Sequence, residues 1–341
     1  MTAYPLYGLL KFSSMNIGDE IQSVAAQRFL PHVDRLIHRE RTDEYQANRK
    51  TKVILNAWWL WNEEHFPPSS DIDPLLISMY FRKEVRDTIL RPDVREWLAA
   101  NGPVGARDMS TMRWLHDSGV DAYFSGCLTL TLQGNPGRPR RDYILTVDLP
   151  EIAVRAIRER TGRPVYSISR ILSAGFAAAD RIELARIALQ LYTSAHAVVS
   201  PCLHVTLPCL AMGTPVLRID DGDGAMDAHG RFEGFTEMLN SRTLEEFLAD
   251  PQTYDFENPP ANPTAHLPMR EDLIRRCTEF TGFDRTTSPL DSGTDPLVEL
   301  FQLLKYDYQV VRRNLWWARP RDLRNTYLAR LRGETKHSVA Y

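Results

Sequence analysis

A short strand–helix–strand unit is the feature that most constrains the fold of this chain of 341 residues. Residues 195–219 read AHAVVSPCLHVTLPCLAMGTPVLRI. The apolar run 197–199 is typical of a buried parallel strand, an apolar helix is expected over 203–212, and residues 214–219 predict a second strand. Gly213 stands where the end of a helix favours a positive φ. Because parallel strands need a crossover between them, this segment predicts a parallel sheet in an α/β fold.

The loop after the first of these strands is the expected place for a ligand. In open α/β sheets, ligands bind at the carboxyl ends of the strands. His204 lies in this loop, at the start of the following helix. Helix N-termini favour anions, and a histidine there can donate a hydrogen bond or a proton to one. We therefore expect an anion site around His204.

Strands alternate with helices along the rest of the chain, which predicts two doubly wound parallel sheets that face one another. Residues 133–142, QGNPGRPRRD, form the best candidate linker. The predicted domains are therefore residues 1–135 and 142–300, followed by a helix and a basic tail over 301–341. Strands are expected over 4–12, 33–39, 52–57, 75–81, 104–106, 122–126, 143–147 and 164–169, and helices over 18–29, 93–100, 150–161, 179–194, 269–280 and 296–315.

Other polar side chains also follow predicted strands. Asn16 and Asp19 lie at a strand-to-helix junction, where they either contact a ligand or cap the helix and favour its dipole. Arg107 and Arg170 follow later strands, and an arginine at such an edge suits bidentate recognition of a carboxylate or phosphate. The alternative for Arg107 is an ion pair with Asp108, or a solvated side chain while Asp108 caps the next helix.

Three tryptophans follow the predicted strand over 52–57. Trp58, Trp59 and Trp61 could form a platform on which a sugar ring stacks. They could equally pack in the core, because large aromatic side chains dominate the energetics of burial. The sequence leaves both interpretations open.

Three segments in order resemble the polysaccharide pyruvyl transferase family. They are NIGDEIQ at 16–22, VGARDMST at 104–111, and the pattern of a strand, S-x-x-L-H, an apolar helix and G-x-P-V from Ser200 to Val216. Together they span about two thirds of the chain. The resemblance implies a GT-B-like arrangement of two Rossmann-like domains across a cleft.

The resemblance also implies a transferase that moves a pyruvyl group from phosphoenolpyruvate to sugar hydroxyls. The acceptor would be a surface or exported polysaccharide, or its lipid-linked precursor. By this resemblance His204 is the general acid, Arg107 grips the donor, and Asp19 orients or deprotonates the acceptor hydroxyl. The remaining expected substrate-binding residues are Asn16, Gly18, Cys202, Leu203, Arg170 and Lys11.

One position departs from the family pattern. Cys202 stands where the family commonly has an arginine, so Arg170 or Lys11 would have to supply the charge. Two competing functions stay open. One is a nucleotide-sugar-dependent glycosyltransferase of the same fold, with Glu183 or Asp220 on the ribose, and the other is a non-catalytic glycan-binding relative.

Bulk composition excludes several other classes. The net charge of −3 gives no reason to expect nucleic-acid binding. The four cysteines show no zinc spacing, and the run DDGDG at 220–224 lacks the length and distal glutamate of an EF-hand loop. We therefore expect reduced thiols, no metal and no cofactor besides the donor substrate.

The sequence also predicts where the protein works. The N-terminus lacks a basic region and a cleavage site, and no run of about 18 apolar residues predicts a membrane span. A cytoplasmic location is expected. The basic, aromatic-rich segment 312–336 either contacts the inner face of a membrane or is a helix packed on the protein.

Overall fold

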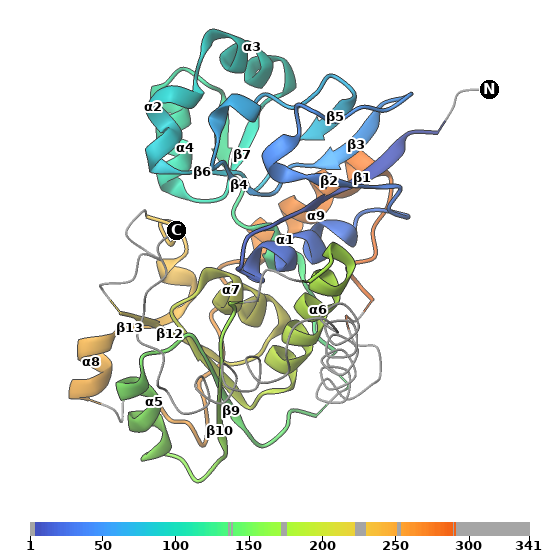
Figure 1. Cartoon of the computed structure of the whole chain (residues 1–341). Coiled ribbons are helices and arrows are strands. Elements are labelled where there is room, and N and C mark those ends of the chain that lie inside the picture. Colours follow the sequence, from blue (N-terminus) through green and yellow to red (C-terminus); the bar gives the residue numbers. More distant parts are fainter. Residues whose placement is uncertain are drawn as a thin grey trace, which may run out of the picture. The chain divides into compact units, whose positions relative to one another are not determined.

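Apolar runs at 6–11, 51–54, 144–147 and 197–200 form the centres of two parallel sheets in the computed structural model (Figure 1). The structure describes residues 4–290 apart from 136, 138, 172–175, 222–229, 251–253 and 289. These residues belong to one compact unit that spans residues 1–296. The predicted helix over 296–315 and the basic tail over 301–341 lie outside the described residues.

The N-terminal sheet has four parallel strands in the order β2 (Arg35–His38), β1 (Leu6–Lys11), β3 (Thr51–Ile54) and β5 (Ile72–Leu75). Helix α1 (Gly18–Gln27) connects β1 to β2. Between β2 and β5 the chain instead uses the short turns η1 (Arg39–Arg41) and η2 (Glu63–His65). The expected alternation of strand and helix is therefore incomplete in this half.

The chain then forms two small parallel pairs, β4 (Trp58–Trp59) with β6 (Tyr80–Phe81) and β7 (Val104–Ala106) with β8 (Ala122–Phe124). The prediction of one strand over 75–81 was wrong. Ser78 has a φ of 55°, and its N–H donates a hydrogen bond to the Ser125 hydroxyl at 3.0 Å, which breaks the extended backbone. The helical elements here are η3 (Lys83–Val85), α2 (Arg86–Ile89), α3 (Pro92–Asn101), α4 (Met109–Asp117) and η4 (Leu128–Thr131).

The C-terminal sheet has five parallel strands and follows the sequence-based expectation closely. Their order is β10 (Val165–Ile168), β9 (Ile144–Val147), β11 (Ala197–Ser200), β12 (Val216–Asp220) and β13 (Asn240–Thr243). The helices are α5 (Glu151–Arg158), α6 (Ala178–Ser194), α7 (Leu203–Met212) and α8 (Leu244–Ala249). Gly213 ends α7 with a φ of 76°, as its position predicted. The predicted α/β class with parallel sheets is confirmed.

Each sheet has its own apolar core, and two helices connect them. Helix α9 (Leu267–Thr281) comes after the C-terminal sheet but returns to the N-terminal one, where the Phe280 carbonyl accepts a hydrogen bond from Lys52 at 2.5 Å (Figure 1). Helix α1 packs against α6, and a buried ion pair of 2.6 Å joins Glu20 to Arg181. The N–H of Ile17 also donates to the Arg170 carbonyl at 3.0 Å.

The helices in the described part of the chain do not combine the length and apolarity that a membrane crossing needs. The longest of them, α6, has 17 residues and includes charged side chains such as Asp180, Arg181 and Glu183.

Candidate functional site

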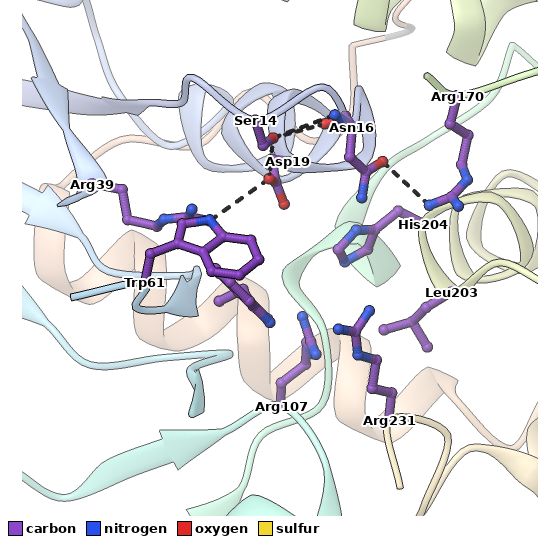
Figure 2. Close-up of a pocket in the computed structure, with 11 residues that line it drawn as sticks. Ser14, Asn16, Asp19, Arg39, Trp61, Arg107, Arg170, Leu203, His204 and Arg231 are labelled. Atoms are coloured by element: carbon purple, nitrogen blue, oxygen red, sulfur yellow. Dashed lines mark hydrogen bonds and ion pairs between the residues drawn. The ribbon is translucent and has the colours of Figure 1, made fainter. Parts of the chain in front are cut away.

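The carboxyl ends of strands from both sheets meet at one cavity of about 190 Å³ (Figure 2). Strand β1 leads to Ser14, Asn16 and Asp19, and β2 leads to Arg39. Most of the other lining residues follow β7, β10 and β11 or lie in or near β4, and Arg231 lies in the segment between β12 and β13. The complete lining is Ser14, Asn16, Asp19, Arg39, Trp58, Trp61, Arg107, Arg170, Leu203, His204 and Arg231.

Strand order explains why the residues converge here. In the N-terminal sheet β1 lies between β2 and β3, and in the C-terminal sheet β9 lies between β10 and β11. The connection after β1 leads to β2 on one side, and the connection after β3 leads toward β5 on the other. The connections after β9 and β11 diverge in the same way, to β10 and β12, which opens a crevice at the carboxyl edge. The loops after β1, β10 and β11 carry Asn16, Arg170 and His204 to this edge.

His204 lies in the first turn of α7, has only 7% of its surface exposed, and its Nε2 has no hydrogen-bond partner among the described residues. Burial lowers the pKa of the imidazole well below 6.5, and three nearby guanidinium groups lower it further. They belong to Arg107, Arg170 and Arg231, and Figure 2 shows Arg107 and Arg231 directed toward the ring. A Cβ on Gly18 would stand 3.0 Å from His204 Nδ1, so the imidazole needs glycine there.

Arg107 lines the cavity directly after β7 with 2% of its surface exposed. Its guanidinium lies 4.3 Å from the centroid of the Tyr80 ring and 3.9 Å from Asp108, and Nη2 has no hydrogen-bond partner among the described residues. Asp108 caps α4 by accepting a hydrogen bond from the Thr111 N–H at 2.9 Å. Burial lowers the pKa of Arg107 and raises that of Asp108. Arg107 therefore lines the cavity and also lies beside Asp108, while Asp108 caps α4.

Arg170 reaches the cavity from the end of β10 and is 4% exposed. Its Nε donates to Asp148 at 2.5 Å, and its Nη1 donates to Asn16 Oδ1 at 3.2 Å. Asp148 follows β9 with a φ of 50°, a strained conformation for a residue with a side chain. Cys202 does not line the cavity: its thiol lies 3.8 Å from the same Asp148 carboxylate, and burial raises the thiol pKa to about 11.

Asp19 is the acidic side chain among the described residues that line the cavity. Its carboxylate accepts a hydrogen bond from the Ser14 hydroxyl at 2.6 Å and one from the Gln22 amide at 3.4 Å. Arg39 lies 3.7 Å from the same carboxylate. Asn16 accepts a hydrogen bond from the Gly18 N–H at 2.9 Å, so it serves the start of α1 as well as the cavity.

The three tryptophans lie in two different environments. Trp59 is fully buried in the core of the N-terminal half. Trp58 and Trp61 line the cavity, their ring centroids are 4.8 Å apart, and Trp61 is 63% exposed.

Three lining residues were not predicted from the sequence: Ser14, Arg39 and Arg231. Arg39 directly follows β2, so the carboxyl-end rule could have found it. Arg231 lies in an irregular segment, and no local pattern marks it. Lys11, which the sequence offered as a donor-binding cation, ends β1 and is not among the lining residues.

No cluster of histidine, cysteine or carboxylate side chains suited to a metal ion occurs among the described residues. Comparison of the sequence with models of known protein families and with curated proteins gives no match. The geometry of the cavity is therefore what bears on function.

Proposed function

We propose that this protein transfers the pyruvyl group of phosphoenolpyruvate to a hydroxyl, or a pair of hydroxyls, of a sugar in a surface or exported polysaccharide or its lipid-linked precursor. One observation carries the proposal. In the small cavity three arginines, Arg107, Arg170 and Arg231, lie near the buried imidazole of His204, and a fourth, Arg39, also lines the cavity. Phosphoenolpyruvate carries a phosphate and a carboxylate on a three-carbon frame, and guanidinium groups recognise both anions.

The size of the cavity favours this donor over a nucleotide sugar. Pockets for drug-sized ligands usually enclose roughly 300–1,000 Å³, and this cavity encloses about 190 Å³. The carboxylates considered for a ribose also lie elsewhere. Neither Glu183 nor Asp220 is a lining residue; Glu183 lies 4.0 Å from Arg186, and Asp220 lies 3.0 Å from Arg218. The glycosyltransferase is therefore the weaker candidate.

The proposed reaction begins with proton transfer to the donor. His204 gives a proton to the methylene carbon. The π electrons of the carbon–carbon double bond form the new carbon–hydrogen bond, a carbon–carbon single bond remains, and positive character develops on the carbon that bears the phosphate. A sugar oxygen attacks that carbon while Asp19 accepts the hydroxyl proton. Loss of phosphate then gives an enol ether if a methyl proton leaves. It gives a ketal if a second hydroxyl attacks and its proton leaves with phosphate.

The pKa of His204 constrains how it acquires its proton. A general acid is most effective when its pKa lies near the working pH, but burial and the surrounding cations hold the pKa of His204 well below 6.5. A multiply charged anion placed among Arg107, Arg170 and Arg231 would offset those cations and raise the pKa again. We therefore expect the donor to bind together with a proton. The imidazole would become an acid only when the substrate is bound.

Arg170 is the proposed replacement for the arginine that the resemblance leads one to expect at Cys202. It extends from a different strand, reaches the same Asp148 carboxylate as Cys202, and lines the cavity. Under this proposal the two sheets correspond to the two Rossmann-like domains of a GT-B-like transferase. The C-terminal sheet holds the donor and the N-terminal sheet the acceptor. A cytoplasmic enzyme with inner-membrane contact fits this role, although residues 312–336 lie outside the described part of the chain.

Isothermal titration of the protein with phosphoenolpyruvate tests the proposal, with UDP-glucose as the comparison ligand. We expect phosphoenolpyruvate to bind. Repeating the titration at pH 7 in buffers of different ionisation enthalpy should show net proton uptake. Arg107→Lys should weaken binding about tenfold, because the ammonium loses the planar fork of the guanidinium. Arg113→Lys, on the exposed side of α4, is the matched control.

Two results would contradict the proposal. Binding of UDP-glucose without phosphoenolpyruvate would favour the glycosyltransferase. Binding of neither ligand, with the wild-type protein fully folded, would favour a glycan-binding protein without this chemistry.

A further inference from the structure

Trp61 is a large apolar side chain that is exposed at a cavity lined mainly by charged groups. Of its surface, 63% is accessible, although burying a tryptophan is strongly favourable. The other large apolar side chains with high exposure in the described part of the chain, such as Tyr4, Ile152 and Tyr166, do not line this cavity. Trp61 therefore stands out by its combination of exposure and position.

The exposed indole is nevertheless held in place. The backbone N–H of Trp61 donates to Glu40 Oε2 at 2.8 Å. The guanidinium of Arg82 lies 4.3 Å from the centroid of the Trp61 ring, and Trp58 meets the ring edge-on. A side chain that is fixed before a ligand arrives loses little conformational entropy on binding. Arg82 lies over one face of the ring, and 63% of the surface of Trp61 stays accessible.

Glu40 connects this ring to the polar groups of the cavity. Arg39 Nε donates a hydrogen bond to Glu40 Oε1 at 2.7 Å, and Arg39 Nη2 lies 2.5 Å from the same oxygen. The other carboxylate oxygen, Oε2, accepts the hydrogen bond from the Trp61 N–H. Arg39 in turn lies 3.7 Å from Asp19, which accepts a hydrogen bond from Ser14. One carboxylate therefore links the backbone of Trp61 to a guanidinium that lies beside the Asp19 carboxylate.

An aromatic face beside such groups matches the chemistry of a pyranose. A sugar ring presents C–H groups on its faces and hydroxyls around its edge, so one residue can stack against the face while others bind the hydroxyls. We infer that Trp61 is the stacking platform for the acceptor's pyranose ring, with Glu40 as a positioning residue. The identification of this sugar as the acceptor rests on the proposed function, whereas the sugar site itself does not.

The position of Trp61 also agrees with the space available. A cavity of about 190 Å³ that holds a three-carbon donor has little room for a hexose as well. The acceptor ring must then lie at the edge of the cavity, and the exposure of Trp61 places its indole there. The hydroxyl to be modified would point inward, toward Asp19 and the donor.

Saturation-transfer NMR and titration with a panel of methyl pyranosides test this platform, and binding of phosphoenolpyruvate is measured in parallel. We expect at least one pyranoside to bind the wild-type protein. Trp61→Ala should raise its Kd about tenfold and Trp61→Phe by less, because phenylalanine keeps an aromatic face. Glu40→Gln should give an intermediate loss. Tyr166→Ala, an exposed aromatic residue on the other sheet, is the matched control and should change nothing.

The outcomes separate this inference from the proposed function. A Trp61→Ala variant that binds pyranosides as tightly as the wild type overturns the platform, and so does a wild-type protein that binds none of the panel. Binding of uridine in place of sugars would assign the ring to a nucleobase and also overturn it. Pyranoside binding that depends on Trp61, without binding of phosphoenolpyruvate, would support the platform and refute pyruvyl transfer.

Discussion

The carboxyl edges of the two sheets contribute to the cavity in different ways. On the C-terminal sheet, His204 and Arg170 are 7% and 4% exposed, and Arg170 is paired with Asp148. On the N-terminal side the lining extends from Arg39, which is 2% exposed, to Trp61, which is 63% exposed. Charges act most strongly where water is excluded, whereas a large and variable ligand needs an accessible surface. Under the proposed function, the buried side would carry out the chemistry and the open side would bind the glycan.

Replacement of His204 should have the largest effect of any change on the buried side. We expect His204→Gln to lower kcat for pyruvyl transfer by about 10² to 10⁴, the range typical of a lost general acid. The melting temperature should change by no more than a few degrees, because glutamine has a similar length. Steady-state rates and thermal melts check both, with the exposed His116→Gln as control. A large loss of stability with an unchanged rate per folded molecule would mean that His204 is only a core residue.

Arg170 and Cys202 both contact the Asp148 carboxylate, so replacing each in turn tests which of them belongs to the donor site. Arg170→Lys should raise the Kd for phosphoenolpyruvate about tenfold, because lysine cannot reach both Asp148 and Asn16 with one planar group. Cys202→Ser should change it less than about twofold if Arg170 carries the charge. Isothermal titration of both variants with phosphoenolpyruvate measures the two Kd values. An equal loss in the two would make Cys202 part of the donor site.

Placing an arginine at position 202, where the family pattern commonly has one, should not tighten donor binding. Cys202 is 1% exposed, and its neighbour Asp148 is already paired with Arg170. Forcing a larger side chain into a packed site costs about 1–3 kcal/mol. The variant should therefore lose stability without gaining affinity.

The smallest expected effect is on the pH dependence of stability. The folded state lowers the pKa of His204 below that of the unfolded chain, so the unfolded state binds a proton first. The resulting stabilisation is complete above pH 6.5 and is lost as the pH falls through the folded-state pKa. Urea unfolding at pH 7.5 and 5.5 should show a larger drop for the wild type than for His204→Gln. Equal drops would mean that the imidazole is not held neutral.

The sequence predicted most of the elements that follow strong local patterns. Alternating apolar runs and a terminal glycine located β9 to β12 and α7 within a residue or two. The prediction failed at 75–81, where a hydrogen bond between Ser78 and the distant Ser125 overrides local β propensity. Nothing in a window of ten residues encodes such a contact.

The site was predictable to the extent that its residues follow strand ends. Asn16, Asp19, Arg107, Arg170 and His204 all line the cavity, although their proposed roles stay predictions. Arg231 could not be found, because its place depends on the path of an irregular segment. Cys202 and Lys11 were candidates by position along the chain, but proximity in sequence to a lining residue does not ensure that a side chain faces the same space.

Helix α1 has a consequence for how the protein unfolds. Residues 18–26 are all buried, including Asp19, Glu20 and Gln22, so this helix has almost no face in contact with water. One surface covers the N-terminal sheet, and Glu20 pairs with Arg181 of the C-terminal half. Separating the halves would expose apolar surface and break the pair between Glu20 and Arg181. We therefore expect the two sheets to unfold together.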